Sequence, residues 1–284
     1  MKSFEQYVDS FSDYYIYSPS LRGKETFLYP LQVGHFIYEA GYRQQRNSYD
    51  SFLLMYIQSG SLTVTLDGID YEAHANQFVY IDCYKPHGYH SDTGWEAMWL
   101  HFDGLVARSY YEQIIEKTGN IFTLPYAVSC IKSLTNIYAM FSGSDSIHEP
   151  LISKYIVDIL TSFMLYTAES PGQINSSSQI SSVVSYISEH FSEDLTVSSL
   201  ASLVALSPYH FIRVFRQETG FTPHEYLINT RMTAARFLLS STSMTIKEIC
   251  FQTGFSRESI FCTAFKKYNG VTPNEYRNTV STKL

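Results

Sequence analysis

The chain has 284 residues, 45% of them hydrophobic and 16% aromatic, which predicts two globular domains that each bury a core. No apolar run approaches the roughly 18 residues of a membrane span, and the N-terminus lacks a basic start followed by an apolar stretch. We therefore expect a cytoplasmic protein with no membrane partner. Four cysteines without a CxxC pair are typical of reduced thiols in that compartment.

The net charge of −7 is unevenly distributed. Residues 1–177 hold 10 Lys and Arg against 19 Asp and Glu, whereas residues 178–284 hold 10 against 8. An acidic part therefore precedes a mildly basic one, although this asymmetry alone establishes no partner.

From Phe27 to Phe102, short strand-like segments alternate with turn residues. The segments Leu53–Ile57, Leu62–Leu66 and Ile69–Ala73 are separated by a Ser-Gly pair and by Asp67-Gly68, which predicts consecutive antiparallel hairpins. We expect an all-β sandwich or barrel of about eight strands.

Helical spacing follows, at Leu105–Lys117 and Leu151–Met164. We expect homodimer contacts on these two helices; the alternative is that they cover their own barrel. A Ser-rich stretch with Pro and Gly then predicts a linker. The predicted domains are residues 1–170 and 180–284, joined by residues 171–179.

The C-terminal part contains an internal repeat: "ALSPYHFIRVFRQETGFTPHEY", from Ala205, returns as "GFSRESIFCTAFKKYNGVTPNEY", from Gly254. In each copy a short helix capped by Thr196 or Thr245 precedes a turn, and a second helix carries two Phe residues four positions apart. The pattern predicts two helix-turn-helix units. A helix from about Pro223 to Leu239 would join them and could place them roughly 34 Å apart, on successive major-groove faces.

The second helix of each unit also has an outward stripe with the spacing i, i+3, i+4, i+7. Such a stripe is typical of a recognition helix in a DNA major groove, whereas a single helical hairpin with a surface arginine is more often only a packed helix pair. The duplication favours recognition helices that bind DNA over a packed helix pair. The stripes are Tyr209, Ile212, Arg213 and Arg216 in the first copy, and Ser259, Cys262, Thr263 and Lys266 in the second.

The run from "RMTAARFLL" to "TIKEICFQTGFSRESIFCTAFKKYNGVTPNEYR", Arg231 to Arg277, resembles the signature of the AraC/XylS family of bacterial transcription regulators. Residues 180–230 resemble that family's first helix-turn-helix. The resemblance implies an all-α domain of seven helices that reads two adjacent major-groove segments of double-stranded promoter DNA.

Carried over position by position, the resemblance assigns DNA contacts to both recognition helices. Family members often have Arg where this chain has Thr263, so we expect Arg213 to be the bidentate base contact and the second helix to contribute less hydrogen-bonded readout. The base contacts would be Tyr209, His210, Ile212 and Arg213 in one groove and Glu258, Ser259, Cys262 and Thr263 in the next, with Arg216 and Lys266 at phosphates.

The segment from Tyr56 to Gly104 resembles the cupin-like ligand-binding domain of sugar-responsive members of that family. This resemblance implies a cupin-like barrel that binds a small-molecule effector, a sugar. His87, His90 and His101 raise the alternative of a metal site, but they lack the His-x-His and following Glu of metal-binding cupins. We expect histidines that pack and hydrogen-bond, with no metal and no cofactor.

Sugars bind against aromatic faces beside a few polar groups. Strand alternation in "WEAMWLHF" puts Trp95, Ala97, Trp99 and His101 on one face, and one face of this strand must look into the barrel. The resemblance places Arg46, Tyr89 and Trp99 at sugar contacts, with Ala97 where arabinose-sensing members have His. We therefore do not expect arabinose held as in those members. The predicted ligand site is Arg46, Tyr89, Trp95, Trp99 and His101.

The sequence as a whole predicts a sugar-responsive activator of carbohydrate-utilisation genes that is not an enzyme. Its expected partners are promoter DNA, a sugar, a second copy of the chain and RNA polymerase. Two alternatives stay open: a metal-binding cupin enzyme fused to a DNA-binding domain, and a regulator with no small-molecule ligand.

Overall fold

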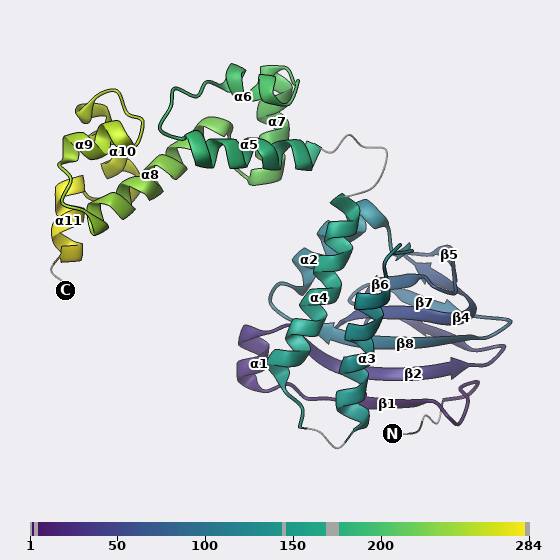
Figure 1. Cartoon of the computed structure of the whole chain (residues 1–284). Helices are drawn as coiled ribbons and strands as arrows, with labels where there is room; N and C mark the ends of the chain where they lie inside the picture. Colours follow the sequence, from purple (N-terminus) through teal and green to yellow (C-terminus); the bar gives the residue numbers. More distant parts are fainter. Residues whose placement is uncertain (1, 3–4, 144–145, 169–175, 282–284) are drawn as a thin grey trace. The chain divides into compact units, whose positions relative to one another are not determined.

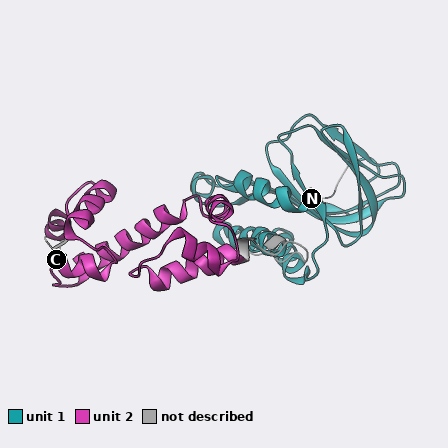
Figure 2. Cartoon of the chain, turned by 90° about the horizontal axis from the view of Figure 1, so that it is seen from above, with its two compact units in different colours: residues 1–170 teal, residues 171–284 magenta. Residues whose placement is uncertain are grey.

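The computed structural model describes residues 2, 5–143, 146–168 and 176–281. The chain divides into two compact units, Met1–Ser170 and Pro171–Leu284 (Figure 2). The first is rich in strands and the second consists of helices, which confirms the predicted fold class. Across these residues, every helix is too short or too polar to cross a membrane.

The predicted linker differs from the structure at its C-terminal end. Residues 171–175 lie outside the described residues, but residues 176–179 belong to helix α5 (Ser176–His190). The helix therefore begins before the predicted boundary at 180. Ile180, Val183 and Ile187 are buried in one core at helical spacing, and the helix extends about one turn before the first of them, over polar residues whose composition had predicted a linker.

In the described part of unit 1, nine strands form one sheet (Figure 1). Six lie in the order β1-β2-β8-β4-β6-β9, while β5 and β7 pair with β4, and β3 pairs with β7. The strands are β1 (Asp13–Ile16), β2 (Tyr29–Tyr38), β3 (Arg43–Arg46), β4 (Phe52–Leu66), β5 (Ile69–His74), β6 (Phe78–Asp82), β7 (His87–His90), β8 (Trp95–Asp103) and β9 (Ile121–Phe122).

Strand β4 corrects one of the predicted hairpins. The chain does not reverse at the Ser-Gly pair; β4 runs through it, pairing first with β6 and β8 and then with β5 and β7. The register against β8 shifts between Ile57 and Ser59, and a Cβ on Gly60 would lie 2.4 Å from the Gly94 carbonyl oxygen. This close approach and the positive φ of 77° at Gly60 mark a bulge that bends the strand. The turn at Asp67-Gly68 is confirmed, with φ of 50° and 79°.

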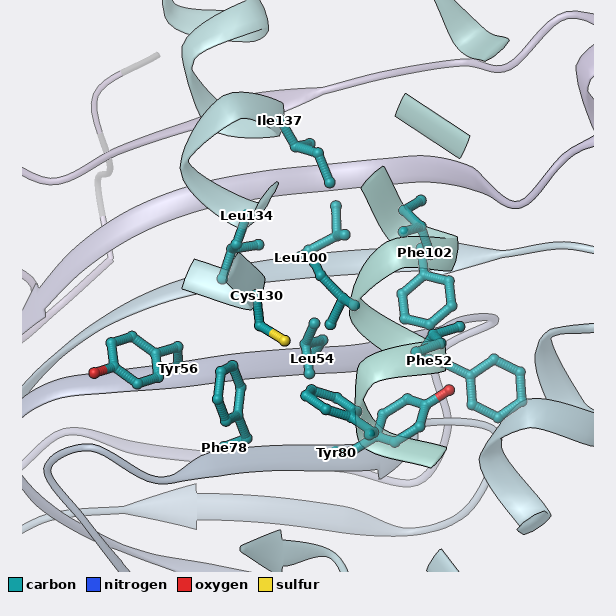
Figure 3. Packing of buried hydrophobic residues seen from close by; sticks show 14 of the residues in the cluster. Phe52, Leu54, Tyr56, Phe78, Tyr80, Leu100, Phe102, Cys130, Leu134 and Ile137 are labelled. Atoms are coloured by element: carbon teal, nitrogen blue, oxygen red, sulfur yellow. The ribbon is translucent and has the colours of Figure 1, made fainter. Parts of the chain in front are cut away.

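The predicted alternation along β8 is confirmed, and both of its faces are buried. Trp95, Ala97 and Trp99 belong to an inner core enclosed by the strands. Leu100 and Phe102 belong to an outer core, which they share with residues of the covering helices such as Cys130, Leu134 and Ile137 (Figure 3).

Helices α2, α3 and α4 pack on the sheet of unit 1 (Figure 1). Five apolar residues of α4 are buried in the outer core: Ile152, Ile156, Ile159, Leu160 and Phe163. Much of the stripe that was expected to form dimer contacts therefore covers its own sheet. The helices of this unit are α1 (Leu21–Thr26), α2 (Ala107–Thr118), α3 (Val128–Ser142) and α4 (Glu149–Ala168).

Seven helices make up the described part of unit 2, the number that the family resemblance implies. Phe211 and Phe215 lie in one core, and Phe261 and Phe265 lie in a second. Helix α8 has 19 residues and contributes to both cores, and its length corresponds to about 28 Å. The helices after α5 are α6 (Val197–Leu203), α7 (Pro208–Thr219), α8 (Pro223–Ser241), α9 (Ile246–Gln252), α10 (Glu258–Asn269) and α11 (Pro273–Ser281).

The repeated Thr-Pro-x-Glu of the sequence is a capping box. Before α8, the Glu225 carboxylate accepts from the Thr222 N–H at 2.8 Å while the Thr222 hydroxyl accepts from the Glu225 N–H. Thr272 and Glu275 make the same pair of bonds at α11. The second half of each repeat thus starts the helix that follows the recognition helix.

Candidate functional site

The first predicted recognition helix, α7, is fixed at both ends. The Ser207 hydroxyl accepts from the His210 N–H, Pro208 occupies the first helical position, and Gly220 ends the helix with a φ of 79°. The turn before it is made by Ala205 with a φ of 53°, where the second copy has Gly254 with a φ of 80°. A turn at this place was predicted in each copy.

The outward face of α7 is open. All five of its predicted DNA contacts are exposed: Tyr209, His210, Ile212, Arg213 and Arg216. Tyr209 is 83% exposed, and one Arg213 guanidinium nitrogen lies 3.4 Å from His210 Nδ1. No carboxylate of the described residues forms an ion pair with Arg213. Its fork of N–H donors is therefore available for a guanine edge or a phosphate.

The second recognition helix, α10, presents a less donating face. Glu258, Ser259, Thr263 and Lys266 are exposed. The Thr263 hydroxyl donates to the Ser259 carbonyl at 2.8 Å, a bond within the helix. This bond uses the hydroxyl proton, so Thr263 offers a base edge an acceptor only.

Cys262 departs from the predicted outward stripe. It is half-buried and packs against the second core, next to Phe261 in sequence. Burial raises the pKa of its thiol, and the nearby Glu258 carboxylate raises it further. A neutral, partly covered thiol is a weak hydrogen-bond partner for a base. The other residues of the second stripe therefore remain as the DNA contacts expected on α10.

Unit 1 contains a partly open cavity of about 220 Å³, lined mainly by residues of the sheet. Six of its thirteen lining residues are Phe, Tyr or Trp, and polar groups lie among them. It is lined by Glu5, Tyr14, Ile16, Gln32, Phe36, Tyr38, Tyr42, Arg46, Leu53, Met55, Tyr89, Trp99 and His101.

Four of the five predicted ligand residues lie in this lining: Arg46, Tyr89, Trp99 and His101. Trp95 does not. Its indole stacks on Tyr38, with ring centroids 3.9 Å apart and planes at 11°, because the two residues are opposite each other in the register of β2 and β8. Trp95 thus supports Tyr38 from behind and is not part of the cavity wall.

Most ionisable groups of the wall are held neutral. Burial lowers the pKa of His101 to about 3, and the positive charges of Arg46 and of protonated His87 lower it too. Burial raises the pKa of the Tyr38, Tyr42 and Tyr89 hydroxyls. The wall therefore offers neutral hydroxyl and imidazole groups beside the charges of Arg46 and Glu5.

One buried donor in the wall has no partner within the described residues. The buried Trp99 Nε1 has no hydrogen-bond acceptor. Arg46 is half-buried and forms no ion pair with any described carboxylate. Its Nη2 donates to the side-chain amide oxygen of Gln44 at 2.9 Å, and its guanidinium lies 5.0 Å from the centre of the Tyr49 ring. An unpaired buried donor is costly, and a bound molecule with an acceptor oxygen would satisfy it.

Tyr49, just outside the wall, is a residue that sequence reasoning missed. Its hydroxyl accepts from Gln32 Nε2 at 2.6 Å, its ring carries the Arg46 guanidinium, and its edge contacts His101 at a centroid distance of 5.0 Å. It thus orients three polar wall residues at once. Glu5 was also missed; it accepts from the Tyr42 hydroxyl at 2.7 Å. No local sequence signal marks either residue, because Gln32, His101 and Tyr42 lie far from them in the sequence.

The histidines do not gather into a metal site. His87 and His101 are buried, and Ser51 Oγ lies 2.8 Å from His101 Nδ1 while His87 Nδ1 bonds the Lys85 carbonyl. Across the described ranges, no group of three or more His, Cys, Asp or Glu side chains is placed to hold an ion.

Two domain families match the chain. The AraC-like ligand binding domain matches residues 30–142, from β2 to the end of α3. A helix-turn-helix domain matches residues 200–279, which include both recognition helices. Together the two matches cover more than half of the 284 residues.

Curated relatives are regulators of transcription by name. The uncharacterized HTH-type transcriptional regulator YisR of Bacillus subtilis is 23% identical over 278 residues, 89% of this chain and 95% of that protein. The regulatory protein PocR of Salmonella typhimurium is 36% identical over 104 residues, 37% of this chain and 34% of PocR. The chain spans less than half of the length of the first three relatives, 46%, 34% and 21%.

Among solved structures, the C-terminal domain of AraT, a response regulator from Geobacillus stearothermophilus, is 40% identical to this chain. The match covers 36% of this chain and 84% of that one, with a TM-score of 0.35.

Proposed function

Because the chain belongs to the AraC family of DNA-binding transcriptional regulators, we propose that it is a sugar-responsive activator of carbohydrate-utilisation genes. Unit 1 binds a monosaccharide in its cavity, and unit 2 binds promoter DNA through α7 and α10. The chain acts by binding and not by catalysis. The observation that carries the proposal is the aromatic cavity with the unsatisfied Trp99 Nε1 donor and the Arg46 guanidinium in its wall.

The chemistry of the cavity supports a polyhydroxylated effector. Aromatic faces suit the C–H surfaces of a sugar ring, and the Trp99 N–H, Arg46 and His101 supply hydrogen bonds to hydroxyl oxygens. The volume of about 220 Å³ is below the 300 Å³ or more of sites for drug-sized ligands, which favours a monosaccharide over an oligosaccharide.

The helical unit supports sequence-specific binding of double-stranded DNA. The two recognition helices carry their exposed stripes on separate cores, and α8 connects them. In this proposal Arg213 reads a base pair, Arg216 and Lys266 bind phosphates, and RNA polymerase is the partner that converts promoter binding into activation. A bacterial promoter as target means that the protein acts in the cytoplasm.

Homodimer formation is part of the proposal. Leu105 is 79% exposed and Val106 51% exposed at the start of α2, and Leu165 near the end of α4 is 66% exposed. These residues are apolar and remain outside the cores of their own unit, so they are the proposed dimer contacts.

A thermal-unfolding screen of the full chain with pentoses, hexoses and disaccharides tests the effector. We expect one monosaccharide at about 100 times its Kd to stabilise the protein by about 2.7 kcal/mol, and disaccharides to have no effect. Trp99→Leu should abolish the stabilisation. Trp95→Phe, which changes the other tryptophan outside the wall, should retain it.

Two results would contradict the proposal. If no sugar stabilises the protein or changes its affinity for promoter DNA, a regulator without a ligand is the better account. If the purified protein contains stoichiometric iron, manganese or zinc, the metal-binding cupin enzyme gains support.

A further inference from the structure

The buried side of α8 passes from one core to the other along the helix. Leu227 belongs to the first core, whereas Met232, Ala235 and Leu239 belong to the second. Arg231 lies between them and is only 9% exposed. A buried guanidinium is costly without partners, so its contacts indicate what it does there.

Arg231 joins the two helix-turn-helix units. Its Nε donates to the Phe191 carbonyl and its Nη2 to the Glu193 carbonyl, both at 2.8 Å, in the segment that follows α5. The same guanidinium lies 5.5 Å from the ring centre of Phe255, which follows the turn of the second unit. One side chain on α8 therefore contacts a loop of the first helix-turn-helix and the turn of the second helix-turn-helix.

The turn itself lies close to the same loop. A Cβ on Gly254 would lie 2.8 Å from the Ser192 carbonyl oxygen, and 2.9 Å from both the Phe191 carbonyl oxygen and Arg231 Nη2. The second helix-turn-helix thus touches the first at the loop that Arg231 binds. Besides α8, this joint connects the two helix-turn-helix units.

We propose that Arg231 is a positioning residue that fixes the angle between the two helix-turn-helix units and thereby the spacing of the two DNA segments that they bind together. Over the length of α8, about 28 Å, a rotation of about 7° moves one unit by about 3.4 Å, the rise of one base pair. The flat fork of Arg231 bonds two carbonyls of one loop, which resists a rotation of this size. This inference rests on DNA binding by both units and is independent of any effector.

The test uses the full chain without sugar. A preferred site is first selected from a library of random DNA duplexes, and affinities are then measured for that site and for versions with one base pair inserted or removed between its two segments. We expect the wild-type protein to lose at least tenfold in affinity for the altered spacings. Arg231→Lys keeps the charge and the alkyl stem but loses the fork, and its loss should fall below threefold.

Arg277→Lys is the matched control. Arg277 Nη2 donates to the Met244 carbonyl at 2.6 Å, a bond within the second helix-turn-helix alone. This variant should therefore keep the wild-type loss of affinity for altered spacings. Gly254→Ala strains the same joint from the other side and should also weaken the penalty.

Three results would overturn the proposal. One is a wild-type protein that tolerates the altered spacings, and another is a folded Arg231→Lys protein with the full wild-type penalty. The third is loss of the helical circular dichroism signal in Arg231→Lys. Each helix-turn-helix has its own core, so a residue that only sets the angle between them should leave both cores folded.

Discussion

Arg213 is the residue for which the two copies of the repeat differ most in DNA chemistry, since the aligned residue of the second copy is Thr263. The exposed guanidinium can donate twice to one guanine, whereas Thr263 has its hydroxyl proton bonded within α10. We expect Arg213→Ala to cost about 1–3 kcal/mol of binding and to relax the preference at one base pair. Competition binding with duplexes that vary one position at a time measures this.

Lys266→Ala is the control for a phosphate contact. Lys266 is exposed near the end of α10, and loss of its charge should weaken all sequences alike and reduce the salt dependence of binding by about one counterion. Equal, sequence-independent losses from both variants would refute the different roles of the two residues.

Gly34 controls the position of Trp99 in the cavity. A Cβ at Gly34 would lie 2.4 Å from Cζ2 and 2.7 Å from Cε2 of the indole. Gly34→Ala must therefore displace the ring, and we expect it to lower the free energy of unfolding by about 1–3 kcal/mol and to change the tryptophan fluorescence. Urea denaturation followed by fluorescence gives both quantities.

The Gly34 prediction has an internal control. Trp99→Phe removes the atoms that the new methyl group would meet, so the double variant should recover part of the stability that Gly34→Ala loses. Additive losses in the double variant would show that the strain arises elsewhere.

At the scale of the element, the capping boxes make the helical unit sensitive to acid. Hydrogen bonds from the backbone N–H and hydroxyl of the preceding threonine lower the pKa of Glu225, Glu248 and Glu275 below their ordinary value of 4.5. A lowered carboxylate pKa contributes stability that is complete above pH 4.5 and is lost as the pH falls through the value in the folded protein. We expect the urea midpoint of the helical signal to be flat from pH 7 to 5 and to fall below pH 4.5.

Replacing the three glutamates with glutamine tests this cause. Glutamine can still complete a capping box but does not ionise, so the triple variant should have a shallower decline at low pH. Glu218→Gln, an exposed position of α7 outside the capping boxes, should leave the decline unchanged. If the triple variant has the same decline of the urea midpoint at low pH, other carboxylates cause that decline.

At the scale of the whole molecule, the proposed function couples two binding sites in different units. If a monosaccharide raises the affinity for the selected DNA site by some factor, linkage requires that this DNA raise the affinity for the sugar by the same factor. Titration calorimetry of the sugar with and without DNA measures it. Sugar binding that is indifferent to DNA would show that the effector does not control DNA binding.

The sequence by itself determined the order of the two units, the duplicated helix-turn-helix and the alternation along β8. These features depend on local periodicity, caps and turn residues, which act between residues a few positions apart. The exposed stripe of α7 follows for the same reason, because Phe211 and Phe215 fix which face is buried.

Only the tertiary structure decided the features that depend on distant partners. The bulge at Gly60 depends on the backbone at Gly94, and Trp95 lies outside the cavity wall because it stacks on Tyr38 opposite it. Tyr49 acquires its role from residues on three strands. Arg231 is likewise one charged residue of a helix until folding brings Phe191, Glu193 and Phe255 around it. Such contacts join residues far apart in the chain, and no local pattern of the sequence encodes them.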